Sequence, residues 1–294
     1  MLGSPKMKRP SITTEMVLIY LSALVLAAAL GPFAKCAADA AVRHSAVARK
    51  ALSFQPYAAR FEPGVVAHGS YNFARVESYF FILCLVALLA VRTRSLGVWP
   101  ALRDSLRLDL RAAGEAANGF VIGVVTVAVF LAAMCLARAW GVCRLKEDWS
   151  VSSPLLLAVV SALGAAVPEE VLFRGVLFAV LARHTTLTRA IILSSLFFLV
   201  PHFLSGHALL PTGFNPWTGP LSGYEAMRIS ARSVLQREGA PALTASLLLI
   251  GALLAWCCAR TSRVYLGIGL HTGWVLAQKA SYVVVCPSPD WPQW

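Results

Sequence analysis

Two adjacent carboxylates and an arginine interrupt an apolar stretch near the middle of the chain, where the residues PEEVLFRG occupy positions 168–175. On a helix, Glu170 and Arg174 share a face and can form an ion pair that keeps one carboxylate charged and fixed. Glu169 is turned about 100° away and is free to face a cavity. One carboxylate can thus be held while its neighbour accepts a proton. An ion pair that only fixes helix register is the alternative, and a second carboxylate without a second cation argues against it.

Two histidines lie in similarly apolar surroundings, His202 at the end of FFLVPH and His271 within the glycine-rich run GIGLHTGW. Counting 1.5 Å per residue from the inner ends places Glu169 about 20 Å deep, His202 about 18 Å and His271 about 11 Å. A carboxylate and a neutral imidazole at one level can hold and deprotonate a water, so we expect Glu169 and His202 to meet. The glycines allow close helix approach, and we expect His271 to donate to the oxyanion of the attacked carbonyl. Taken singly, each histidine also fits a packing role.

The elements that must position these groups are membrane helices. The chain has 294 residues, of which 58% are hydrophobic and only 14% charged, and its apolar residues form runs near the ~20 residues needed to cross a bilayer. We therefore predict an all-α, polytopic transmembrane bundle of about seven or eight spanning helices. The apolar regions are 16–33, 78–91, 116–137, 149–182, 190–204, 239–259 and 264–285.

Two of these regions are irregular in length. The region 78–91 is short, so we expect its helix to extend upstream with Arg75 and Glu77 reaching toward the interface. The region 149–182 is too long for one straight span and is interrupted near Pro168, so it is either one long tilted helix or two segments. The first region, 16–33, fits a retained span better than a signal peptide, because no small-residue cleavage site follows directly.

The formal net charge of +12 comes from Lys and Arg that lie mostly between the apolar runs. This distribution favours membrane orientation and anionic lipid contact over nucleic-acid binding. It predicts an amino terminus in the cytoplasm.

We divide the chain into amino-terminal spans (1–150), a core with the motifs (151–286) and a tail (287–294). The connection 205–238 is rich in Pro and Gly and should be an irregular outer loop. His184 and His207 are expected at the interface and in that loop, outside the site.

The spaced motifs Glu-Glu-x-x-x-Arg, Phe-x-x-x-His and a late His in a glycine-rich helix resemble the CAAX prenyl protease and bacteriocin-processing (CPBP) family of intramembrane endopeptidases. The resemblance implies that Glu169 activates the water, that His202 with Phe198 in its motif helps to position it, and that Glu170 and Arg174 support them. It also implies that His271 forms the oxyanion hole together with an Asn or Asp four residues later.

The sequence departs from the family pattern at that last position, where Val275 stands. Trp274 or Gln278 could supply the missing donor. A lost oxyanion donor typically costs about 10²- to 10³-fold in rate. Family members have been described as metal-dependent and as metal-independent. Glu169, His202 and His271 could be three ligands of a zinc ion, but without a His-x-x-x-His pair we favour metal-free hydrolysis that needs no cofactor.

The interpretation is an intramembrane endopeptidase of the bacterial cytoplasmic membrane. The resemblance implies a substrate that is the carboxy-terminal segment of a membrane-anchored or lipidated protein, or a small secreted peptide. Two other classes remain open. A non-catalytic immunity or scaffold protein is favoured by Val275, and a proton-coupled transporter would use the same carboxylates and imidazoles. Transporters commonly contain repeated halves, and we find no internal repeat.

Overall fold

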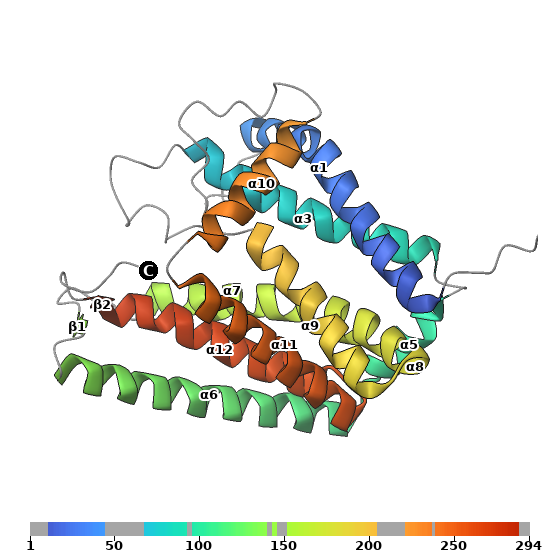
Figure 1. The fold of residues 1–294 in the computed structure, drawn as a ribbon. Helices are drawn as coiled ribbons and strands as arrows, with labels where there is room; N and C mark the ends of the chain where they lie inside the picture. The colour runs from blue at the N-terminus through green and yellow to red at the C-terminus, as the bar shows by residue number, and fades with distance from the viewer. Residues whose placement is uncertain are drawn as a thin grey trace, which may run out of the picture. The chain divides into compact units, whose positions relative to one another are not determined.

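The computed structural model describes residues 11–44, 68–92, 96–139, 143–145, 152–204, 221–236 and 239–287. Apart from one short strand pair, every described element is helical, so the expected helical class is confirmed (Figure 1). The elements are α1 (Ile12–His44), α3 (His68–Val91), α5 (Val98–Ser105), α6 (Leu110–Ala139), β1 (Cys143–Leu145), α7 (Ser152–Glu170), η2 (Val171–Phe178), α8 (Ala179–His184), α9 (Leu187–Leu204), α10 (Ser222–Leu235), α11 (Ala240–Thr261), α12 (Tyr265–Val284) and β2 (Val285–Pro287).

The chain forms two compact units. The first comprises Met1–Val98, Val180–Arg189 and Pro201–Val234, and the second comprises Trp99–Ala179, Ala190–Val200 and Leu235–Trp294. Helix α9 therefore gives its central residues to the second unit and both ends to the first. In the first unit α1 and α3 pack together, with the Tyr20 and Phe81 rings meeting edge to face at 5.1 Å.

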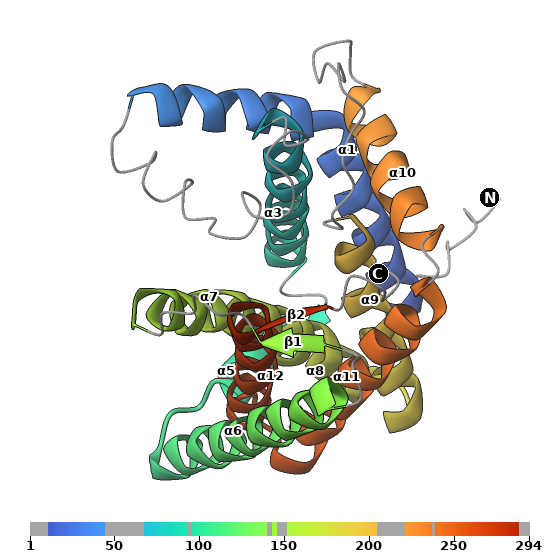
Figure 2. The same cartoon turned by 90° about the vertical axis from the view of Figure 1, so that its left-hand side faces the viewer.

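Helices α6 and α12 form the most intimate helix pair of the second unit, and they run side by side in Figures 1 and 2. A Cβ on Gly123 would lie only 2.7 Å from the Cα of Gly273, and one on Gly269 only 2.6 Å from the Phe120 nitrogen. The glycines thus let the two backbones touch, as small residues do where membrane helices cross. The opposite side of α12, which carries Gly267 and His271, faces α7.

In the long apolar region 149–182, the described residues 152–182 form one continuous helical run rather than two segments. It passes from α7 through the π-helix η2 into α8, and Pro168 is accommodated inside the last turn of α7. A π-helix widens the turn to an i to i+5 spacing and is frequent at functional sites. Seven of its eight residues, Leu172 to Phe178, are buried.

One local expectation needs correction. The connection 205–238 contains a regular helix, α10, because residues 222–235 hold a single glycine and no proline and place Ala226, Met227, Ser230 and Val234 on a buried face. The short helix α5 follows the same amphipathic logic. The short strands β1 and β2 pair in antiparallel register, with Cys143 opposite Pro287 (Figure 2).

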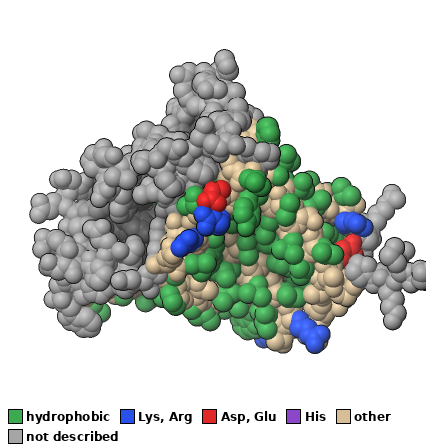
Figure 3. Space-filling view, turned by 45° about the horizontal axis from the view of Figure 1, so that its top comes forward, with side chains coloured by type: hydrophobic (Ala, Val, Ile, Leu, Met, Phe, Trp, Pro, Cys, Tyr) green, Lys and Arg blue, Asp and Glu red, His purple; other side chains and the backbone are tan. Residues whose placement is uncertain are grey.

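Within the described residues, Ile12–Phe33, Leu187–Leu204 and Ala240–Thr261 are long and apolar enough to cross a membrane. Helix α3 begins upstream of the apolar region 78–91, as expected. Hydrophobic side chains cover most of the described surface in Figure 3, with few charges among them. Such a surface is suited to lipid and supports an integral membrane protein. His207, most of the 205–238 connection before α10, and the tail after Pro287 lie outside the described residues.

Candidate active site

The Glu170 carboxylate is the centre of a buried polar cluster in the second unit. Its Oε1 atom accepts a hydrogen bond from Arg174 Nη1 at 2.9 Å and lies 2.9 Å from His271 Nδ1. The side chains of Glu170, Arg174 and His271 are 0%, 1% and 7% exposed. The i, i+4 ion pair read from the sequence is therefore present, although the residues between its partners belong to a π-helix.

Glu169 points at the other side of the same imidazole. Its Oε2 atom lies 4.0 Å from His271 Nε2, and its side chain is 23% exposed. The imidazole is thus placed between the two neighbouring carboxylates. The count of residues from the helix ends gives depths of about 20 Å for Glu169 and about 11 Å for His271, which are compatible with one site. The structure brings these two side chains together.

Several polar atoms of the cluster are buried without a hydrogen-bond partner among the described residues. They are Glu169 Oε2, Glu170 Oε2 and Arg174 Nε. Buried polar groups are nearly always paired in folded proteins, because each unpaired one costs free energy. Three unpaired buried polar atoms in one cluster indicate a functional site rather than an ion pair that serves only packing.

Arg174 is held by more than its carboxylate partner. Its Nη2 donates to the Gly251 carbonyl of α11 at 3.3 Å, and its guanidinium carbon lies 4.3 Å from the centre of the Phe198 ring. The same ring meets His271 edge to face at 6.0 Å. Phe198, which the sequence offered only as part of a motif, therefore contacts both partners of Glu170 from α9.

Gly267 provides the room that the second carboxylate oxygen occupies. A Cβ at this position would lie 3.0 Å from Glu170 Oε2, closer than nearly all real contacts. Gly267 and His271 are four residues apart on α12 and share the face turned to Glu170. The glycine-rich pattern was read as a sign of helix packing, and this contact adds a second reason for it within the site.

Three other residues were candidates from the sequence: His202, Trp274 and Gln278. His202 is half-buried one turn after Phe198 on α9 and belongs to the first unit, so its part in the site stays a prediction. Trp274 packs against an apolar cluster of α11 and α12 that contains Leu254, which favours a packing role for its ring. Val275 is half-buried. The side chain of Gln278 lies outside the described residues.

No three His, Cys, Asp or Glu side chains of the described chain come together in a way that would hold a metal ion. Glu170 Oε1 is already shared by Arg174 and His271, and a guanidinium beside it disfavours a divalent cation. The zinc site considered from the sequence joins Glu169 and His271 to His202 of the first unit, so it stays a prediction, and the chemistry below is built on side chains alone.

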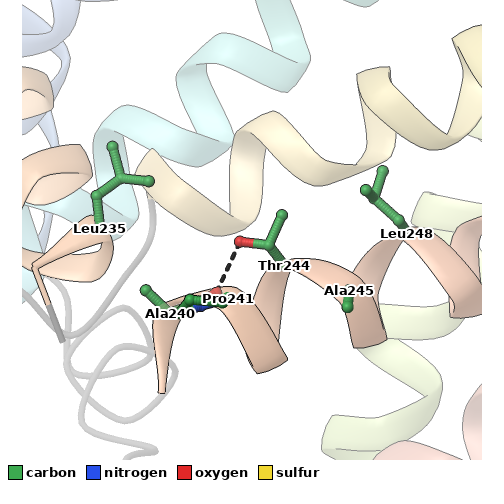
Figure 4. Close-up of a pocket in the computed structure, with 6 residues that line it drawn as sticks. All are labelled: Leu235, Ala240, Pro241, Thr244, Ala245 and Leu248. Carbon is green, nitrogen blue, oxygen red and sulfur yellow. Dashed lines mark hydrogen bonds between the residues drawn. The ribbon is translucent and has the colours of Figure 1, made fainter. Parts of the chain in front are cut away.

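An open apolar hollow of about 430 Å³ lies at the amino-terminal end of α11 (Figure 4). It is lined by Leu235, Ala240, Pro241, Thr244, Ala245 and Leu248. The Thr244 hydroxyl donates to the Ala240 carbonyl at 2.7 Å, so this polar group is already used within its own helix. None of these described lining residues is an acid or a base that could act in hydrolysis.

The motif-bearing part of the chain matches a known protease family. Residues 151–277 match the family model described as type II CAAX prenyl endopeptidase Rce1-like. The match confirms the resemblance. This segment contains the Glu-Glu-x-x-x-Arg motif, Phe198, His202 and His271, and it excludes α1, α3, α5 and α6. No curated protein and no solved structure matches the chain.

Proposed function

We propose that the protein is an intramembrane endopeptidase that hydrolyses a peptide bond with a water activated by Glu169. The observation that carries the proposal is the imidazole of His271 lying between two carboxylates, bonded to Glu170 at 2.9 Å and facing Glu169 at 4.0 Å. Similarity of residues 151–277 to a protease family supports the same reaction class.

The distance between Glu169 and His271 suits a bridging water. It exceeds a direct hydrogen bond, yet a water can lie about 2.8 Å from both atoms. With its Nδ1–H donated to Glu170, a neutral His271 presents an accepting Nε2. The water then directs one hydrogen to each acceptor and turns an oxygen lone pair toward the scissile carbonyl.

Glu169 carries the proton from the water to the leaving group. As the water attacks, its proton passes to Glu169, and later it passes to the leaving amine. Glu170 stays charged beside Arg174 and fixes the imidazole. His202 on α9 is proposed to help position the water. The oxyanion role expected for His271 requires its protonated form, in which Nε2 becomes a donor.

We infer that the substrate is the carboxy-terminal segment of a membrane-anchored or lipidated protein, or a small secreted peptide. The proposed surroundings are the bacterial cytoplasmic membrane, with the amino terminus in the cytoplasm and seven or eight spanning helices. The support for these points is the similarity to the CAAX endopeptidase model, the apolar helices and the basic residues between the apolar regions.

The test compares membranes of a host that expresses wild type or Glu169→Gln, with the ends of membrane-protein fragments mapped by mass spectrometry. We expect fragments that appear only with wild type and persist in the presence of a chelator. Fragments that disappear with the chelator would make the reaction metal-dependent. Equal fragments from both proteins, or none from either, would leave a binding or transport protein and contradict the proposal.

A further inference from the structure

Two consecutive backbone carbonyls of the π-helix η2 accept hydrogen bonds from side chains of other helices. The Ser105 hydroxyl of α5 donates to the Gly175 carbonyl at 3.1 Å, and the Cys258 thiol of α11 lies 3.9 Å from the Arg174 carbonyl. Ser105 is 3% exposed and Cys258 is 5% exposed. Both donors therefore bind the turn of η2 that contains Arg174, and the Arg174 side chain binds the Glu170 carboxylate.

Ser105 also contacts the residue that leads into the helix that carries His271. The amide of Val264, which immediately precedes α12, donates to the Ser105 carbonyl at 3.3 Å. A Cβ on Gly175 would lie 3.3 Å from the Ser105 hydroxyl and 3.5 Å from a methyl group of Val264. One residue of α5 is therefore joined to the two elements that present Arg174 and His271.

Hydrogen bonds from other helices should stabilise the backbone of η2. Its i to i+5 register is rare and less favourable than α-helix, and the amide of Ala179 at its end bonds back to Val176 instead of following that register. The arrangement that places Arg174 against Glu170 thus depends on contacts from outside the helix.

We propose that Ser105 is a positioning residue of the site, acting through the Gly175 carbonyl and η2 to keep Arg174 on the Glu170 carboxylate. The proposal rests on the peptidase function proposed above. It assigns part of the site to α5, which lies outside the segment similar to the endopeptidase family.

The Ser105 hydroxyl has two other possible acceptors besides the Gly175 carbonyl. The Ser105 hydroxyl also lies 2.9 Å from the Ala101 carbonyl and 3.1 Å from the Leu102 carbonyl. Its single hydrogen serves one acceptor at a time. Loss of a hydrogen bond of this kind corresponds to about a two- to tenfold change in an equilibrium or rate.

The test uses the full chain in nanodiscs with Ser105→Ala, and Ser194→Ala as its matched control. Ser194 is equally buried, and its hydroxyl donates to Ile191 of its own helix at 3.1 Å. Hydrogen–deuterium exchange of residues 171–179 is measured first because it needs no substrate. We expect Ser105→Ala to raise exchange there about two- to tenfold and Ser194→Ala to leave it at the wild-type level.

The second readout is the rate at which the variants form the wild-type fragments from host membrane proteins, followed across pH. A positioning role predicts a rate about two- to tenfold lower with a displaced pH profile, and recovery in Ser105→Thr, which keeps the hydroxyl. Destabilisation alone scales the rate equally at every pH. If Ser105→Ala does not accumulate, Gly175→Ala replaces it, because its Cβ presses on the same hydroxyl.

The outcomes separate the two proposals. If Glu169→Gln still forms the fragments, the peptidase function is wrong, whatever Ser105 does. If Glu169→Gln is inactive while Ser105→Ala, or Gly175→Ala in its place, keeps wild-type exchange, rate and pH profile, the positioning role of Ser105 is overturned. Unchanged exchange with a uniformly lower rate overturns it as well.

Discussion

The buried ion pair between Glu170 and Arg174 should show strong energetic coupling. Arg174→Gln removes the cation 2.9 Å from a carboxylate that is 0% exposed, and it also removes the donor to Gly251 and the cation that faces Phe198. Loss of one partner of a buried pair typically costs about 3 to 5 kcal/mol, because a charge is left buried without its counter-ion. His271 remains beside Glu170 but cannot replace a permanent charge, so we expect a cost in this range.

Removing both charges should cost much less than the two single changes together. In Glu170→Gln/Arg174→Gln no uncompensated charge is left in the cluster, and two amides can bond to one another. The assay is a double-mutant cycle on the free energy of unfolding, measured by SDS titration in mixed micelles. We expect a coupling energy of at least about 2 kcal/mol, since residues in one polar network couple by roughly 0.5 to 3 kcal/mol.

The matched control is the pair Glu225 and Arg228 on α10, whose atoms approach to 2.6 Å but whose side chains are 43% and 47% exposed. Solvent screens this pair, so the same cycle with Gln substitutions should give little coupling. Additive costs at Glu170 and Arg174, as small as those of the control pair, would refute the description of a dry and tightly bound carboxylate.

Three other changes test the packing and charge around the site. Gly267→Ala places a Cβ 3.0 Å from a fixed carboxylate oxygen and should lower stability by about 1 to 3 kcal/mol, whereas Gly164→Ala, whose Cβ meets no described atom within 4 Å, should be neutral or stabilising. Gly123→Ala should separate α6 from α12 and lower the thermal midpoint, and an unchanged midpoint would count against the close backbone contact. At Asp109, the hydrogen bond from Arg263 lowers the carboxyl pKa. The pair therefore contributes stability at neutral pH that is lost as pH falls below about 4, so Asp109→Asn should flatten the loss of thermal midpoint on acidification.

The sequence predicts the helical class and the central charge pair for clear physical reasons. Long uncharged runs have few alternatives to membrane helices, and Glu170 and Arg174 four residues apart on a helix have few alternatives to each other. The catalytic roles of Glu169, Glu170, Arg174, His202 and His271 stay predictions, as does the division of the chain at residue 150.

Other features depend on tertiary contacts that spacing does not encode. The π-helix after Glu170 leaves no signature in VLFRGVLF, because its register depends on donors such as Ser105 from elsewhere in the chain. The closeness of His271 to Glu169 depends on how α12 packs between its neighbours. Helix α10 was missed because prolines and glycines before residue 222 outweighed a regular pattern of buried positions after it.

The most direct test of the proposed mechanism is a cleavage assay with the purified protein in nanodiscs. The substrate is an intact membrane protein whose fragments were identified in the host. Wild type should cleave it, and Glu169→Gln should bind it equally well but cleave it at least about 10²- to 10⁴-fold more slowly, the usual contribution of a general base. Cleavage by Glu169→Gln at the wild-type rate would contradict the claim that this carboxylate activates the water.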